Sequence, residues 1–150
     1  MLACEDGCDA SSHTLGAVHV MYKHYLDIAG KWAFVFAYNI GEEDLAEIGE
    51  WLEALGARRR EILRAQRLLL KPNKGFTFSS QSLRMSVMVI GDATSLDQWW
   101  DTLDHEIDHL QDTVLEYYAV DHGTEDAAWL QGYIMRLIVK ALRQDGTMFQ

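Results

Sequence analysis

The chain is organised around the stretch Trp99–Leu115, which reads WWDTLDHEIDHLQDTVL. Apolar residues recur in it at intervals of three and four, the spacing that places side chains on one face of an α-helix. Ser95 and Gln98 fit a capping box, so we expect this helix to begin near Leu96. The regularly spaced apolar residues are Trp99, Leu103, Ile107, Leu110 and Val114.

The same stretch contains His105-Glu106-Ile107-Asp108-His109, which is the pattern H-E-x-x-H. Helical residues four apart face the same side, so His105 and His109 can bind one ion. Glu106 projects about 100° around the helix from His105, where it can hold a metal-bound water without becoming a ligand. Zinc hydrolases divide their ligands in this way, so the sequence predicts a Zn²⁺-dependent hydrolase, specifically a peptidase. The alternative is a pair of surface histidines on an acidic helix.

A catalytic zinc ion needs a third protein ligand. Asp112 and Glu116 continue along the same helix and cannot close a tetrahedron well. If the helix ends near Tyr118, about 13 Å beyond His109, a loop of six residues is long enough to return. Glu125 can then face the histidines from the start of the next helix. The same reach leaves two alternatives open, His122 and Asp126.

The composition describes a folded protein of about one domain. Of the 150 residues, 49% are hydrophobic and 24% are charged, which argues against disorder. We expect a flexible lead at residues 1–13 and a single domain at residues 14–150. The formal net charge of −10 would repel a nucleic-acid backbone, so we expect no nucleic-acid partner. The predicted peptidase activity implies a peptide or protein substrate. The sequence does not indicate an oligomeric state.

The cysteines and the apolar segments of the sequence indicate the cellular compartment in which the protein is expected. No signal peptide follows Met1 and no apolar run is long enough to span a membrane, so we expect a cytoplasmic protein with reduced thiols and no membrane partner. Cys4 and Cys8 lie in the lead, and together with His13 they could form a second metal site. Their spacing matches no established zinc finger, so a frayed tail is the better interpretation.

The pattern predicts an α+β fold. Alternating aromatic and small residues at 31–40 indicate a buried strand, whereas residues 14–28 fit either a helix or a strand. Helices are expected at Glu42–Leu55, Ala57–Lys71 and 125–143. Strand-like runs at Gly75–Ser80 and Leu83–Ile90 suggest a hairpin or a bulged pair.

The helix at 57–71 carries a basic face. One interpretation is a docking surface for an acidic partner, and the other is a solvated face that pairs with the acidic helix before it. A nucleic-acid function for this helix conflicts with the net charge. The arginines of the face are Arg58, Arg59, Arg60, Arg64 and Arg67.

Two segments, DTLDHEIDHL at Asp101–Leu110 and EDAAWLQGY at Glu125–Tyr133, resemble the pattern NTxxHExxHL…ExxAYLxGY of a family of small zincin-like, gluzincin-type metallopeptidases of bacterial and prophage genomes. Gly75–Ser79 and the segment VMVIGDATS at 87–95 are also similar to that family, so the likeness covers residues 31–142. Trp129 stands where the family has tyrosine. It also stands four residues after Glu125, where many gluzincins carry an aspartate that braces a histidine.

The resemblance implies His105, His109 and Glu125 as zinc ligands and Glu106 as the general base. It implies a minimal zincin-like fold, in which a small mixed sheet packs on the metal helix and the next helix supplies the third ligand. It also implies that the strand at 83–90 aligns an extended peptide by edge pairing. Candidates to brace the histidines are Asp101 and Asp112, and candidates to stabilise an oxyanion are Tyr117, Tyr118, His122 and Tyr133.

A competing function is a non-catalytic zincin-like protein that binds a partner, with its metal kept only as a structural support or lost. Glu106 argues against this interpretation, because a structural metal site needs no base.

Overall fold

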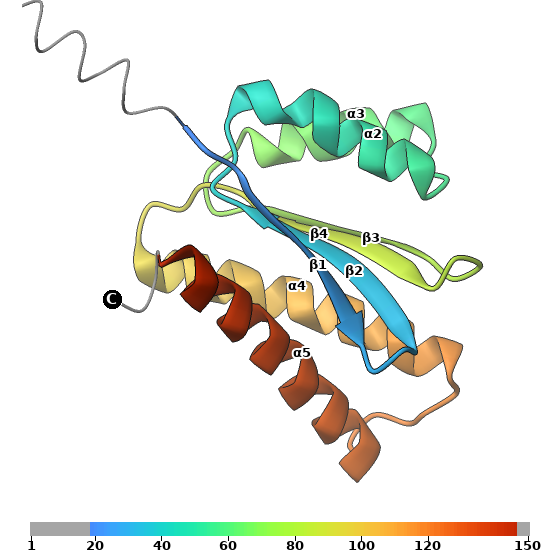
Figure 1. Cartoon of the computed structure of the whole chain (residues 1–150). Helices are drawn as coiled ribbons and strands as arrows, with labels where there is room; N and C mark the ends of the chain where they lie inside the picture. The colour runs from blue at the N-terminus through green and yellow to red at the C-terminus, as the bar shows by residue number, and fades with distance from the viewer. Residues whose placement is uncertain (1–18, 147–150) are drawn as a thin grey trace, which may run out of the picture.

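The structure, a computed structural model, describes residues 19–146, so the predicted lead with Cys4, Cys8 and His13 lies outside the described residues. The described part is a mixed four-stranded sheet with a pair of helices on each face (Figure 1), which confirms the predicted α+β class. The strands are β1 (Tyr22–Ile28), β2 (Trp32–Tyr38), β3 (Gly75–Ser80) and β4 (Met85–Ile90). The helices are α2 (Leu45–Ala54), preceded by a 3-10 turn at Glu42–Asp44, then α3 (Arg59–Leu69), α4 (Leu96–Tyr117) and α5 (Glu125–Asp145).

The strand order is β1-β2-β4-β3. β1 is antiparallel to β2, β4 is parallel to β2, and β3 is antiparallel to β4. The ambiguous segment at 14–28 therefore contains a strand, and the predicted hairpin of β3 and β4 is confirmed. The strand expected from Leu83 begins at Met85 instead, because Arg84 turns the chain with a φ of 51°. β3 is left as an edge of the sheet.

The two faces of β2 explain how the layers assemble. Its alternate residues Trp32, Phe34, Phe36 and Tyr38 belong to the core beneath α4 and α5. Ala37 and its neighbours on the other face belong to a second core beneath α2 and α3. Strand alternation thus separates large aromatic residues from small ones, and fully burying an aromatic such as Phe36 stabilises the fold by about 1.5–3 kcal/mol.

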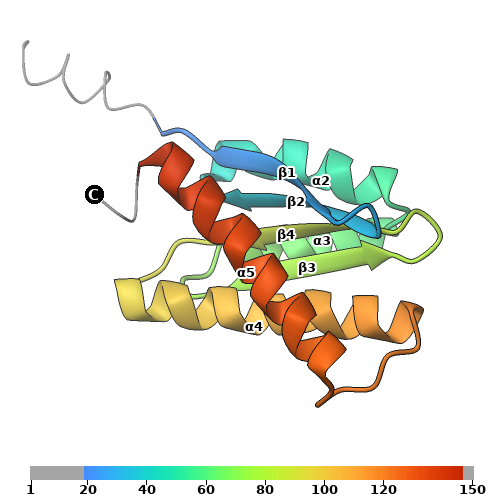
Figure 2. The same cartoon turned by 60° about the horizontal axis from the view of Figure 1, so that its bottom comes forward.

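The helices α4 and α5 begin as the sequence predicts. Ser95 Oγ accepts the Gln98 amide at 3.1 Å, and Thr124 Oγ1 accepts the Ala127 amide at 3.2 Å, so each helix has a side-chain N-cap. α5 ends where Gly146 takes a left-handed φ of 70°. Figure 2 shows the two long helices on the same face of the sheet, opposite α2 and α3.

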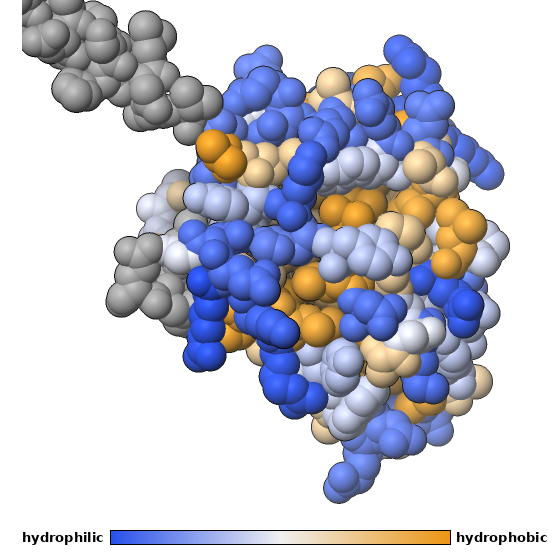
Figure 3. Space-filling view, in the orientation of Figure 1, coloured by the Kyte–Doolittle hydropathy of each residue, from blue (hydrophilic) through white to orange (hydrophobic). Residues whose placement is uncertain are grey.

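Polarity follows these layers. In the space-filling view of Figure 3, hydrophilic side chains cover most of the outward surface of the upper helix pair, and hydrophobic ones show in the bands between helices and sheet. Within residues 19–146, no helix is both long and apolar enough to cross a bilayer.

Candidate metal centre

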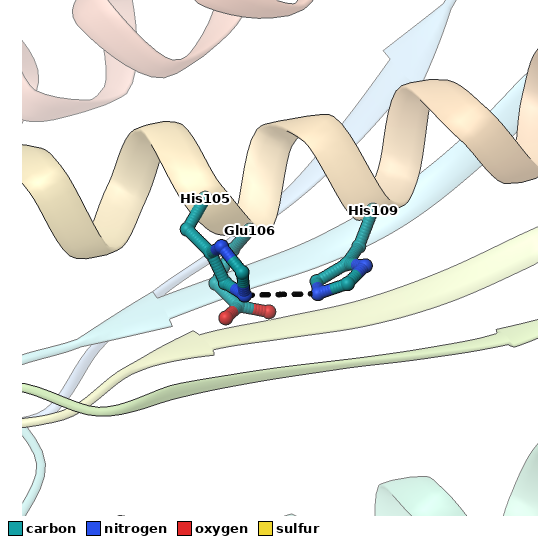
Figure 4. A group of neighbouring side chains, drawn as sticks. All are labelled: His105, Glu106 and His109. Atoms are coloured by element: carbon teal, nitrogen blue, oxygen red, sulfur yellow. Dashed lines mark hydrogen bonds between the residues drawn. The ribbon is translucent and has the colours of Figure 1, made fainter.

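The middle of α4 presents His105, Glu106 and His109 on one flank of the helix (Figure 4). The apolar stripe of α4 is buried against the sheet, and this fixes the rotation of the helix about its axis. Glu106 lies at the edge of the buried stripe and is only 4% exposed, whereas both histidines are exposed. A buried carboxylate therefore lies directly beside two accessible imidazoles.

The two histidines contact each other through their Nε2 atoms, which lie at hydrogen-bond distance (Figure 4). Their Nε2 atoms are 3.0 Å apart, and their rings meet edge to face at an interplanar angle of 87°. Two nitrogens bound to one tetrahedral zinc at the usual bond length lie about 3.3 Å apart. The observed separation is within a few tenths of an ångström of that value, so the pair fits zinc with little movement of either side chain. The ligand atoms of His105, Glu106 and His109 all lie within 4.8 Å of one another.

Glu106 is held from the sheet. Thr77 Oγ1, on strand β3, donates a hydrogen bond of 2.7 Å to Glu106 Oε1. A buried carboxylate without a hydrogen-bond donor would lose the free energy of its hydration without compensation. The carboxylate of Glu106 is therefore favoured in the orientation that keeps the bond to Thr77. Sequence reasoning missed Thr77. The period of two in β3 places Thr77 and Gly75 on one face, but nothing local reveals that this face meets α4.

Gly75 allows β3 to approach α4 closely. A Cβ atom at this position would lie 2.8 Å from Glu106 Cγ, 3.0 Å from Thr102 Cγ2 and 3.1 Å from the Val89 carbonyl oxygen. The first contact is shorter than any real Cβ contact, and the last is to backbone that cannot easily move. The absence of a side chain at Gly75 is therefore a condition for the position of Glu106.

The structure does not bring Glu125 together with the histidines. Glu125 is the exposed first residue of α5 and belongs to neither group of potential metal ligands found among residues 19–146. Gln111 of α4 donates to the Ala127 carbonyl oxygen at 2.9 Å, so α5 begins against α4, but Gln111 lies about 200° around α4 from His109, on the side away from the histidines. Ala127 is buried, and Glu125 lies about 200° around the helix from it, pointing elsewhere. Its role as a ligand stays a prediction.

The alternative third ligands also lie outside the group. His122 Nε2 lies 2.8 Å from Asp112 Oδ1, with both side chains exposed. Asp126 lines a separate apolar cavity with Trp129. The other potential ligand group among the described residues is a surface contact in which His19 Nε2 lies 2.9 Å from Asp44 Oδ2, and its third member is Glu43.

The residues expected to support the site are placed differently from the prediction. Among the described hydrogen bonds, neither Asp101 nor Asp112 accepts one from His105 or His109. Tyr118 donates to the Lys31 carbonyl oxygen. None of the four residues considered for oxyanion stabilisation lines the cavity that contains the two histidines. These residues are Tyr117, Tyr118, His122 and Tyr133.

A cleft of about 650 Å³ runs beside the histidines. Its floor is the free edge of β3, one wall is α4, and the other wall is α3 through Arg64 and Leu68. The prediction that the strand at 83–90 aligns a peptide by edge pairing was wrong, because that strand is not at an edge of the sheet. β4 has hydrogen-bonded neighbours on both sides, so β3 is the strand that can accept another one here.

Comparison of the chain with protein-family models, with curated proteins and with solved structures gives no match.

Proposed function

We propose that this chain is a zinc-dependent metallopeptidase of the zincin-like, gluzincin type. The observation that carries the proposal is the convergence of His105 Nε2 and His109 Nε2 to 3.0 Å beside a carboxylate that is buried and held by Thr77. Two nitrogen ligands with an adjacent carboxylate that is not needed as a ligand are the parts of a zinc hydrolase.

The roles of His105, Glu106 and His109 follow from their placement, whereas the role of Glu125 rests on the family resemblance. His105 and His109 would hold the zinc, and Glu125 is the expected third ligand. Zinc, when bound, polarises the substrate carbonyl and lowers the pKa of water. Glu106 would accept the proton of the attacking water and return it to the leaving amine, because its carboxylate lies beside the histidines and cannot rotate away freely.

For Glu125 to become a ligand, its side chain must turn toward the histidines. The Gln111 hydrogen bond holds the start of α5 on the other side of α4, so the first turn of α5 and the loop before it would have to move toward the histidines. Zinc binding would supply the free energy for this change.

The free edge of β3 supports a peptide substrate. An extended chain can add to such an edge through backbone hydrogen bonds. The cleft places that edge next to His105, Glu106 and His109, so a peptide added to β3 would pass the proposed centre.

The test is the zinc content and the peptidase activity of full-length protein purified without added zinc. Wild type, Glu106→Gln, His109→Ala and Glu125→Ala are compared by metal mass spectrometry and by cleavage of a quenched peptide library. We expect about one zinc in wild type and in Glu106→Gln, less in the other two, and cleavage by wild type alone. His122→Ala is the matched control, because it removes an exposed histidine outside the centre.

Each result separates the alternatives. Zinc without cleavage in wild type would favour a structural metal and a binding protein. Absence of zinc from wild type after incubation with the ion would refute the metal centre. Full zinc content in Glu125→Ala would leave the centre intact but assign its third ligand elsewhere.

A further inference from the structure

Helix α3 carries a row of basic side chains that form no salt bridge with the described residues. Counting 100° per residue, three basic side chains of α3 lie within about 60° of one another on the helix surface, and Lys71 follows just after the helix ends. None of the four forms an ion pair with a carboxylate among residues 19–146, although the sequence suggested pairing with α2. On α2, Glu47 pairs with Lys23 of β1 instead. The exposed cations of the row are Arg60, Arg64, Arg67 and Lys71.

One member of this row reaches the cleft. Arg64 lines the cavity that contains His105 and His109, and Leu68 lies one turn further along the same wall. Leu68 also borders the adjoining cavity beside Glu106. The α3 wall therefore offers one apolar position close to the proposed reaction centre and one cationic position a turn away from it.

The spacing of these two positions fits an extended peptide. Arg64 and Leu68 are four residues apart, which corresponds to about 6 Å along a helix. Side chains two residues apart in a strand lie on the same face and are about 6.6 Å apart. Figures 1 and 2 show α3 running roughly along the direction of β3, so a strand added to β3 would present alternate side chains to Arg64 and Leu68.

The opposite wall is acidic at the end beyond His109. Asp112 and Glu116 of α4 line the same cleft as Arg64. The intervening side chain of an added strand would face this wall, where a carboxylate is repelled. The two walls thus distinguish the two faces of a bound peptide.

We propose that the cleft selects extended peptides that carry an acidic and an apolar side chain two positions apart, the acid facing Arg64 and the apolar side chain facing Leu68. This inference names the substrate class of the proposed peptidase and so rests on the proposed function. The peptide residue that stands between the acidic and the apolar residue points its side chain toward α4, and this side chain is neutral or basic. Because the formal net charge of the chain is −10, the row of cations that includes Arg64 is a local exception and does not indicate a general affinity for anions.

The test measures binding separately from cleavage. Full-length Glu106→Gln protein is titrated into a fluorescein-labelled decapeptide, with and without one equivalent of zinc. The decapeptide carries leucine and glutamate two positions apart, and its other residues are serine and threonine. Matched peptides carry glutamine or lysine in place of the glutamate. We expect the glutamate peptide to bind about fivefold more tightly than the glutamine peptide by fluorescence anisotropy, and the difference to shrink as salt is added.

Charge reversal sharpens the test. In the Glu106→Gln background, Arg64→Glu should abolish the preference for glutamate and create one for lysine. Arg59→Glu is the matched control, since Arg59 lies on the same helix but lines a cavity between α2 and α3. It should leave the preference unchanged. Arg64 and Arg59 are both exposed, so neither variant disturbs the core.

Equal binding of the three peptides, no binding of any, or an equal loss in the Arg59 variant would overturn the inference. Failure of the proposed function has a different signature. In that case the glutamate preference and its dependence on Arg64 are present, but wild type cleaves no peptide. Cleavage without any dependence on Arg64 would retain the peptidase and reject this specificity.

Discussion

Two of the histidine–carboxylate groups in the layer formed by α4 and α5 are built in opposite ways. At the end of α5, Asp145 Oδ2 lies 2.8 Å from His24 Nε2 and also accepts the Tyr38 hydroxyl. In the middle of α4, Glu106 is held by the neutral Thr77 hydroxyl, and the Nε2 atoms of His105 and His109 face each other.

The difference separates a structural contact from a candidate site. Asp145 satisfies two polar groups of β1 and β2 at once and fastens the end of α5 to strands far away in sequence, since its position is 121 residues after His24. Among the described contacts, the α4 histidines have each other and no carboxylate as hydrogen-bond partner, so a cation that displaces this contact can bind both Nε2 atoms. The carboxylate beside them keeps an oxygen that Thr77 does not use.

The largest expected effect comes from Gly75→Ala. The added methyl group would collide with Glu106 and with backbone, so we expect a loss of about 1–3 kcal/mol in the free energy of unfolding. If the proposed peptidase function holds, displacement of Glu106, the proposed base, should also reduce cleavage by about two orders of magnitude. Urea unfolding and peptide cleavage measure the two effects.

Gly132→Ala is the matched control for this change. Gly132 lies within α5, and its nearest contact for an added Cβ is the Arg136 side chain at 3.6 Å. Alanine is the better helix former, so this variant should be more stable by up to about 1 kcal/mol. Equal stability and activity of the Gly75 variant and wild type would mean that β3 does not fix the position of Glu106.

A smaller effect is expected from Thr77→Val, which keeps the shape of the side chain but removes the donor to Glu106. We expect roughly tenfold slower cleavage with unchanged zinc content, because Glu106 keeps its place but loses its orientation. Thr77→Ser retains the hydroxyl and should keep most of the activity. A loss of zinc in the valine variant would instead place Thr77 among the groups that support the ligands.

The smallest effect on the site is expected from Asp145→Ala. This change should destabilise the fold by about 1–3 kcal/mol, because His24 and Tyr38 lose their shared acceptor. Zinc content and cleavage by the folded protein should equal those of wild type. Asp145→Asn keeps an acceptor oxygen and should recover part of the stability in urea unfolding. If the alanine variant lost zinc while still folded, the two groups would be coupled through α5 and the comparison would fail.

The sequence predicted those features of the site that lie within one helix. His105 and His109 are four residues apart on a helix whose apolar stripe and Ser95 cap are visible in the sequence, so their convergence follows from helical geometry. The strands were predicted equally well where alternation was strong, as in β2. The segment now seen as β1 was ambiguous, because its short pattern fits both periods.

What the tertiary structure decided is which distant segments meet at those helical residues. A hairpin of β3 and β4 can join a sheet by either strand, so local periodicity could not show that β3 forms the edge or that Gly75 and Thr77 hold Glu106. The direction in which Glu125 points and the freedom of Arg64 to face the cleft depend likewise on how α5 and α3 dock. Short-range geometry is fixed by backbone hydrogen bonding within an element, whereas strand order and helix docking are fixed by burial shared among many distant residues.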